Sequence, residues 1–167
     1  MNRALGTLAL LAALISSAWA DSGILPDPTI TPGVVRTTNI GEVCNEGSTR
    51  ELRHWSRDRD DHIIAEYGLP GGAHPQYEVD HLIPLCLGGA DSDANLWPQP
   101  RRSIEPTWNA ERKDELEARM CSLACSSVLY AAAAQKEIAD DWTEAWRKYF
   151  PEPGNFFPPA VGAMTPR

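Results

Sequence analysis

The stretch that most constrains this chain is YEVDHLIPLCLGGADSDANLWPQP, between residues 77 and 100. Its first apolar run is interrupted by the adjacent polar residues Asp80 and His81, and a Gly-Gly pair then gives a strong turn signal. A second apolar run starts at Asn95 and meets two prolines, which cannot donate to a strand ladder. We therefore predict a strand over residues 77–85, a loop, and a short second strand over residues 95–97 that the prolines end.

Helical spacing of apolar residues surrounds this strand pair. Ser48-Thr49 could cap a helix that runs to about Tyr67, and two longer helices are expected over residues 108–124 and 127–149. These elements predict an α+β fold, in which a small β-hairpin plus a helix forms the core and further α-helices flank it. Such a unit buries little apolar area, so additional cross-links would stabilise it.

The two ends of the chain differ in composition from its middle. Residues 1–20 have a basic start, an apolar run and an Ala-x-Ala site near Ala20, which is typical of a signal peptide; an uncleaved anchor is the alternative. We expect an extended arm over residues 21–42, one domain over residues 43–150 and a disordered Pro-rich tail over residues 151–167. The mature chain would then be periplasmic or secreted.

Four cysteines fit this oxidising destination, because small exported domains are often held by disulfides. Three pairings are possible. Cys121 and Cys125 are four residues apart on a predicted helix, where a bridge between them would be strained. We therefore favour bridges from this helix to Cys44 and Cys86, with a four-cysteine zinc site as the alternative.

The net charge of −8 argues against a large basic surface for nucleic acid. A local one is still possible, since basic side chains gather after the second strand: Arg101, Arg102, Arg112, Lys113 and Arg119. Acidic residues are interleaved with them, so the alternative is a solvated helix face with ion pairs.

Asp80 and His81 lie among apolar neighbours and must face polar partners. The pair could simply hydrogen-bond a neighbouring loop. It could also be catalytic, with the carboxylate holding a cation and the imidazole taking a proton from water. Adjacent residues of a strand point to opposite faces, so a shared site requires the end of the strand or a bend. Asn95 can donate and accept at once, which suits a residue that orders the loop.

Three sequence segments resemble the HNH, or ββα-metal, nuclease family: VDHLIPLCLGG, NLWPQP and NAERKDELE. The chain is similar in particular to small exported bacterial HNH-like proteins. The resemblance extends over about residues 43–142 and is densest from Tyr77 to Cys121. It implies a hairpin and a helix that enclose one divalent metal ion, with Mg²⁺ expected first and Mn²⁺ second.

The same resemblance implies roles for individual residues. His81 would be the general base that activates water, Asn95 would order the loop and the backbone of the His strand, and Asp80 would be a metal ligand. No histidine follows His81, so the third motif position must be filled by another residue. Asn109 at the start of the helix is the preferred metal ligand, ahead of Lys113 and Asp114.

The substrate expected from this family is nucleic acid, DNA more than RNA. Arg101, Arg102, Arg112 and Lys113 would hold its phosphates, and Trp108 is the best candidate for stacking on a base. The other histidines, which are His54, His62 and His74, are expected to be exposed or locally bonded.

The sequence thus predicts a secreted metal-dependent endonuclease without sequence specificity. The alternative is a catalytically silent HNH-like module that binds components of the cell envelope. An antibacterial toxin domain would need a delivery module, and none is visible in the sequence.

Overall fold

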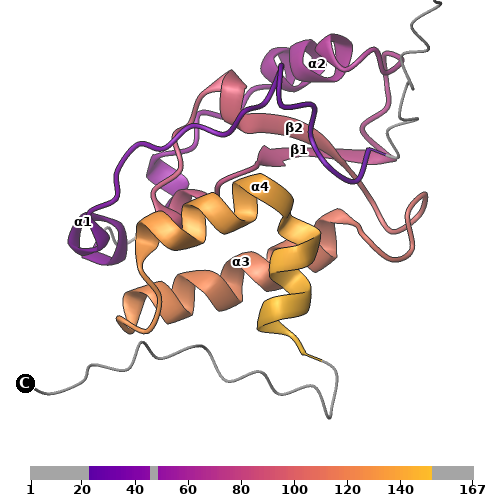
Figure 1. Cartoon of the computed structure of the whole chain (residues 1–167). Coiled ribbons are helices and arrows are strands. Elements are labelled where there is room, and N and C mark those ends of the chain that lie inside the picture. Colours follow the sequence, from indigo (N-terminus) through magenta and orange to yellow (C-terminus); the bar gives the residue numbers. More distant parts are fainter. Residues whose placement is uncertain (1–22, 46–48, 152–167) are drawn as a thin grey trace, which may run out of the picture.

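A computed structural model describes residues 23–45 and 49–151 of the chain. The predicted signal peptide and the predicted tail beyond Pro151 lie outside the described residues. The elements, in chain order, are α1 (Ile40–Asn45), η1 (Thr49–Glu51), α2 (Arg57–Glu66), β1 (Tyr77–His81), η2 (Leu85–Leu87), η3 (Asp93–Asn95), β2 (Leu96–Pro100), α3 (Ala110–Cys125) and α4 (Ala131–Tyr149). Figure 1 shows α2 over one face of the two strands, with α3 and α4 on the opposite side. The α+β class is confirmed.

The two strands form an antiparallel hairpin in which Tyr77 lies opposite Pro100 and His81 lies opposite Leu96. The prediction that the prolines end β2 is wrong, because both lie inside it. The Arg101 amide donates to the Gln76 carbonyl, and the Leu82 amide donates to the Asn95 carbonyl. These two bonds identify which cross-strand residue pairs are hydrogen-bonded and which are not. In the antiparallel alternation, both prolines then take non-bonded positions, where an amide would point away from β1.

β1 ends at His81 rather than at Leu85, because the chain turns inward there to close the loop. This turn depends on the close approach of Gly89. A Cβ at Gly89 would lie 1.9 Å from the carbonyl oxygen of Ile83, so only glycine fits. The early end of the strand places Asp80 and His81 at its last two positions.

The first long helix begins later than predicted. Only the short turn η1 forms at Thr49, and residues 52–56 are not helical. α2 starts at Arg57, where the Ser56 hydroxyl accepts a hydrogen bond from the Arg59 amide at 3.1 Å and caps the helix. The non-helical segment carries Arg53 and His54 toward the end of β1.

α3 begins within two residues of its prediction, and α4 begins four residues after its own. α4 is interrupted at Asp141, which has extended φ and ψ angles of −164° and 100°. Its carboxylate accepts hydrogen bonds from the amides of Thr143 and Glu144, so it caps the second half of the helix. At this kink the second half of α4 turns away from the direction of its first half (Figure 1).

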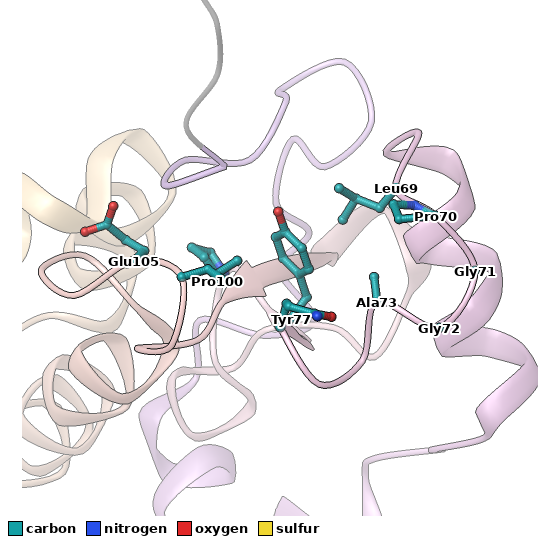
Figure 2. Close-up of a pocket in the computed structure, with 10 residues that line it drawn as sticks. Leu69, Pro70, Gly71, Gly72, Ala73, Tyr77, Pro100 and Glu105 are labelled. Atoms are coloured by element: carbon teal, nitrogen blue, oxygen red, sulfur yellow. The ribbon is translucent and has the colours of Figure 1, made fainter.

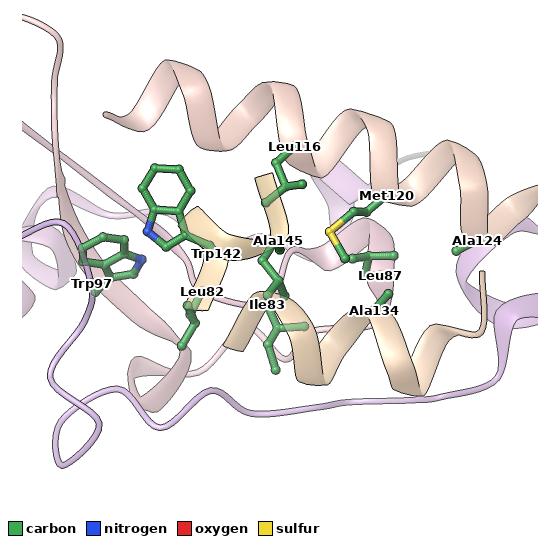
Figure 3. Close-up of a cluster of buried hydrophobic side chains, with 11 residues drawn as sticks. Leu82, Ile83, Leu87, Trp97, Leu116, Met120, Ala124, Ala134, Trp142 and Ala145 are labelled. Carbon is green, nitrogen blue, oxygen red and sulfur yellow. The ribbon is translucent and has the colours of Figure 1, made fainter. Parts of the chain in front are cut away.

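The hydrophobic core lies where α3 and α4 meet the hairpin (Figure 3). Leu116 of α3 points toward Trp142 of α4, Met120 lies beside Leu87, and Trp97 reaches this core from β2. Trp97 is opposite Asp80 in the hairpin, so both side chains project to the α3 face of the sheet. The packing of α3 therefore decides what surrounds Asp80.

Two disulfides tie α3 to the rest of the domain, as predicted: Cys44–Cys125 links it to α1, and Cys86–Cys121 links it to η2. All four thiols are thus paired, which leaves none for the alternative zinc site. Disulfides of this kind are typical of proteins from oxidising compartments. Among the residues that the structure describes, no helix is both long and apolar enough to cross a membrane.

From residue 23, where the described structure begins, the predicted N-terminal arm has no helix before α1, and it lies against the hairpin. Val35 forms a β-bridge with Gly89. The buried hydroxyl of Thr31 donates to the carbonyl oxygen of Leu96 at 2.7 Å. The arm therefore covers the edge of β2 and the loop that precedes it.

Candidate active site at the end of the hairpin

The end of β1 brings Asp80 and His81 together. Both side chains are nearly buried, with 8% and 2% of the surface of each residue exposed. The Nδ1 atom of His81 lies 3.4 Å from a carboxylate oxygen of Asp80. The end of the strand therefore allows the shared site that the sequence analysis required.

A third residue, Asp91, holds the other side of the imidazole. Its Oδ1 atom lies 3.0 Å from the Nε2 atom of His81. Burial raises the pKa of Asp91, but hydrogen bonds from the His54 backbone, Arg59 and the two histidine side chains outweigh it and hold the pKa below its ordinary value. An ionised carboxylate only accepts hydrogen bonds, so Nε2 must carry the proton. In the neutral ring, the lone pair then sits on Nδ1, which faces Asp80.

The environment of His81 favours this neutral form. Burial lowers the pKa of the imidazole to about 4, and the positive charge of Arg53 lowers it in the same direction. Hydrogen bonding to Asp91 opposes both effects without reversing them. At neutral pH the ring is therefore uncharged, with Nδ1 available to accept a proton.

Three carboxylates gather on the α3 side of Asp80. Oxygens of Asp80, Asp114 and Glu117 all lie within 4.8 Å of one another. Two oxygens that bind one Mg²⁺, Mn²⁺ or Ca²⁺ at about 2.1–2.5 Å are at most about 5 Å apart, so the spacing fits one hard cation. The chemistry of the donors fits as well, because these cations prefer carboxylate oxygen.

The charge of this acidic cluster is only partly compensated. The ammonium of Lys113 is fully buried and contacts Glu117, while Arg53 contacts Asp80. Desolvation raises the pKa of Glu117, although Lys113 opposes the shift. Partial desolvation and the nearby charge of Glu78 raise the pKa of Asp114. Both shifts show that a further positive charge would stabilise the cluster.

Asn95 lies at the centre of the loop, fully buried, and both ends of its carboxamide are engaged. Its Oδ1 accepts from the Ile83 amide at 3.0 Å, and its Nδ2 donates to the carbonyl oxygens of Ile83 and Ala90, each at 2.9 Å. These bonds join the two ends of the loop directly after the His strand. This is the ordering contact that the sequence predicts for Asn95.

Asn109 is placed differently from the predicted metal ligand. It is the N-cap of α3: its Oδ1 accepts from the Arg112 amide at 3.1 Å, and its Nδ2 donates to the Glu105 carbonyl at 2.9 Å. The side chains of this helix that join Asp80 in a cluster of carboxylates are Asp114 and Glu117. The observed contacts of Asn109 are therefore those of a helix cap.

The structure separates the four predicted phosphate ligands. Lys113 is fully buried and donates to the His81 carbonyl at 2.7 Å, so its ammonium does not face solvent. Arg101 pairs with Glu78 at 2.9 Å, and Arg102 is exposed. Arg112 lies over the ring of Trp146, 4.4 Å from its centroid. Of the four residues, buried Lys113 is therefore closed to a phosphate, and exposed Arg102 is the most open to one.

Trp108, the predicted stacking residue, is part of an aromatic cluster between α3 and α4. It meets Trp142 and Trp146 edge to face, at centroid distances of 5.7 and 5.8 Å. The guanidinium of Arg147 lies 4.5 Å from the centre of its ring. Its surroundings are therefore largely filled by the chain itself.

A pocket of about 550 Å³ lies at the opposite end of the hairpin (Figure 2). Tyr77 stands in its middle, between Pro100 and the loop that carries Ala73. Tyr77 and His81 are four positions apart on β1, or about 13 Å at the usual rise of a strand. The pocket is therefore separate from the Asp-His pair.

Three important residues of this site were not predicted from the sequence: Arg53, Asp91 and Glu117. The sequence offered one signal for Asp91: it is an acidic residue in the loop between the two strands, and such a residue can turn back to His81, which directly precedes that loop. Glu117 follows Asp114 by three positions and therefore shares its helix face. Arg53 gave no such signal, because its segment was expected to be helical.

The other histidines behave largely as expected. His54 is exposed and bonds Asp91 through its Nδ1 at 3.0 Å. His62 is exposed on α2, and His74 bonds Asp61 at 2.7 Å.

Comparisons of the chain with protein families, with curated proteins and with solved structures found no match.

Proposed function

We propose that this protein is a metal-dependent endonuclease that hydrolyses phosphodiester bonds of nucleic acid in the manner expected of the HNH family. One observation carries the proposal: a buried histidine, held by Asp91 at Nε2, directs its unprotonated Nδ1 toward Asp80 in a cluster of three carboxylates. Phosphodiester hydrolysis needs a base for water next to a cation for the developing charge on the phosphate oxygens. The site offers a position for each.

In this proposal, Asp80, Asp114 and Glu117 hold the divalent cation, Mg²⁺ or Mn²⁺. The cation supplies Lewis-acid stabilisation of the phosphate and of the leaving oxygen when it is bound. The ligand set differs from the one expected from the sequence, since the two acidic residues of α3 replace Asn109.

His81 takes a proton from the attacking water at Nδ1. Asp91 holds the imidazole at Nε2, which keeps the tautomer and then stabilises the imidazolium. Asn95 fixes the loop that carries Asp91 relative to the end of β1. Exposed Arg102 is the predicted phosphate ligand most open to a substrate.

The test is cleavage of supercoiled plasmid and of labelled single-stranded DNA and RNA by the purified mature protein. Mg²⁺ or Mn²⁺ should support cleavage, and EDTA should abolish it. His81→Ala should lose the activity and stay folded, whereas His62→Ala, an exposed histidine outside the site, should keep it. Cleavage by His81→Ala at the rate of the unchanged protein would reject the mechanism. Absence of cleavage with every metal would favour the silent binding module.

A further inference from the structure

Arg53 occupies a position that the proposed mechanism does not use. Its guanidinium contacts the carboxylate of Asp80, and its Nη2 atom lies 3.3 Å from the Nδ1 atom of His81. The side chain thus stands between the base and the presumed metal ligand, where it donates to both.

The two cations of the site differ in how easily they can leave. Lys113 is fully buried, and its ammonium is held by a carbonyl oxygen and by Glu117. The Arg53 side chain retains 40% of its surface exposed, and it projects from the non-helical segment before α2. A guanidinium in contact with water exchanges partners at low cost, because exposed ion pairs are weak.

The backbone next to Arg53 is nevertheless fixed. The His54 amide donates to Asp91 at 2.7 Å, and the same carboxylate binds His81. Release of the guanidinium from Asp80 therefore moves the side chain alone. Its charged end stays near the space in front of Nδ1, where the attacking water would lie with the scissile phosphate next to it.

We propose that Arg53 is the exchangeable cation of this site: it neutralises Asp80 until a divalent metal ion binds there, and the released guanidinium then binds the phosphate of the substrate. A guanidinium and a divalent ion repel each other, so they compete for the same carboxylate. The planar fork of arginine matches the oxygens of a phosphate, which gives the displaced group its next partner. The second half of this inference rests on the proposed nuclease function.

The first test measures metal binding without nucleic acid. Mn²⁺ is titrated by electron paramagnetic resonance into the unchanged protein, Arg53→Gln and Arg57→Gln. Arg57 is an exposed arginine of α2 that pairs with Asp61, so its replacement controls for the loss of one charge. Arg53→Gln should bind Mn²⁺ about two to five times more tightly, which is the range expected for removal of a partly exposed competing pair. Equal or weaker binding by a folded Arg53→Gln protein would overturn the exchange.

The second test measures phosphate binding with thymidine 3′,5′-bisphosphate, by calorimetry, with and without saturating Mn²⁺. With Mn²⁺, Arg53→Gln should bind this probe at least about tenfold more weakly than the unchanged protein, and without Mn²⁺ the two should bind alike. Equal loss in both conditions, or no loss, would overturn the second half. If Mn²⁺ affinity rises in Arg53→Gln but the unchanged protein cleaves no nucleic acid, the exchange stands and the nuclease proposal fails.

Discussion

Replacing Lys113 with methionine tests how the core holds its charges. The fully buried ammonium donates to the His81 carbonyl at 2.7 Å and to Glu117, and methionine keeps much of the side-chain length while removing both bonds. Loss of one partner from a buried ion pair costs about 3–5 kcal/mol. Because the Glu117 side chain retains 15% of its surface exposed, we expect the lower end, about 3 kcal/mol of unfolding free energy.

Urea unfolding followed by circular dichroism measures this loss, and pH gives a second readout. Desolvation already raises the pKa of Glu117, and removal of Lys113 raises it further. A raised carboxyl pKa in the folded state favours folding at low pH, so the loss should be larger at about pH 8 than at about pH 5. Adding Glu117→Gln should recover part of the stability. A loss below about 1 kcal/mol, together with weaker oligonucleotide binding, would refute the burial argument and support the phosphate role predicted from the sequence.

Asp91→Asn should slow metal-dependent cleavage by about 10–100-fold and leave Mn²⁺ affinity unchanged, because the amide no longer fixes the tautomer of His81; an unchanged rate would contradict this positioning role. Lowering the pH from about 6.5 to about 4 should remove about 3 kcal/mol of stability through His81 alone, since its folded pKa of about 4 lies below the unfolded value and the unfolded chain binds the extra proton. His81→Gln should flatten this part of the stability curve, and an unaltered curve would show that other groups cause it. Replacing Cys44 and Cys125 together by serine should cost about 4.5 kcal/mol in urea unfolding, because 81 residues separate them; a loss under about 1 kcal/mol would show that the unfolded chain is compact without the bridge.

The parts of the fold that could be predicted are those encoded by local signals. The Gly-Gly pair marks a turn whose backbone approach admits no side chain at Gly89, and Asn95 has the donors and acceptor that a closed loop needs. The apolar stripe of α3 gave its position within two residues. Disulfide geometry also favoured bridges from Cys121 and Cys125 to Cys44 and Cys86, because two cysteines four residues apart on one helix cannot pair without strain.

The parts that could not be predicted depend on contacts between distant residues. Helical spacing extended the first helix over Arg53, but the hydrogen bond from the His54 amide to Asp91 anchors this segment in a non-helical form. The metal-ligand expectation for Asn109 followed a motif position, whereas the orientation of α3 turns Glu117 to the site and leaves Asn109 as a cap. No local pattern in the sequence encodes that rotation of the helix.

The two prolines of β2 have a consequence for association between copies of the chain. Strand addition at a sheet edge requires free amide donors, and on the outer edge of β2 these would come from positions 96, 98 and 100. Pro98 and Pro100 have no amide hydrogen, while the Leu96 amide is bonded to the Asp93 carbonyl and the Leu96 carbonyl accepts from Thr31. An incoming strand would find no amide donor along β2, so this edge resists aggregation even at high local protein concentration.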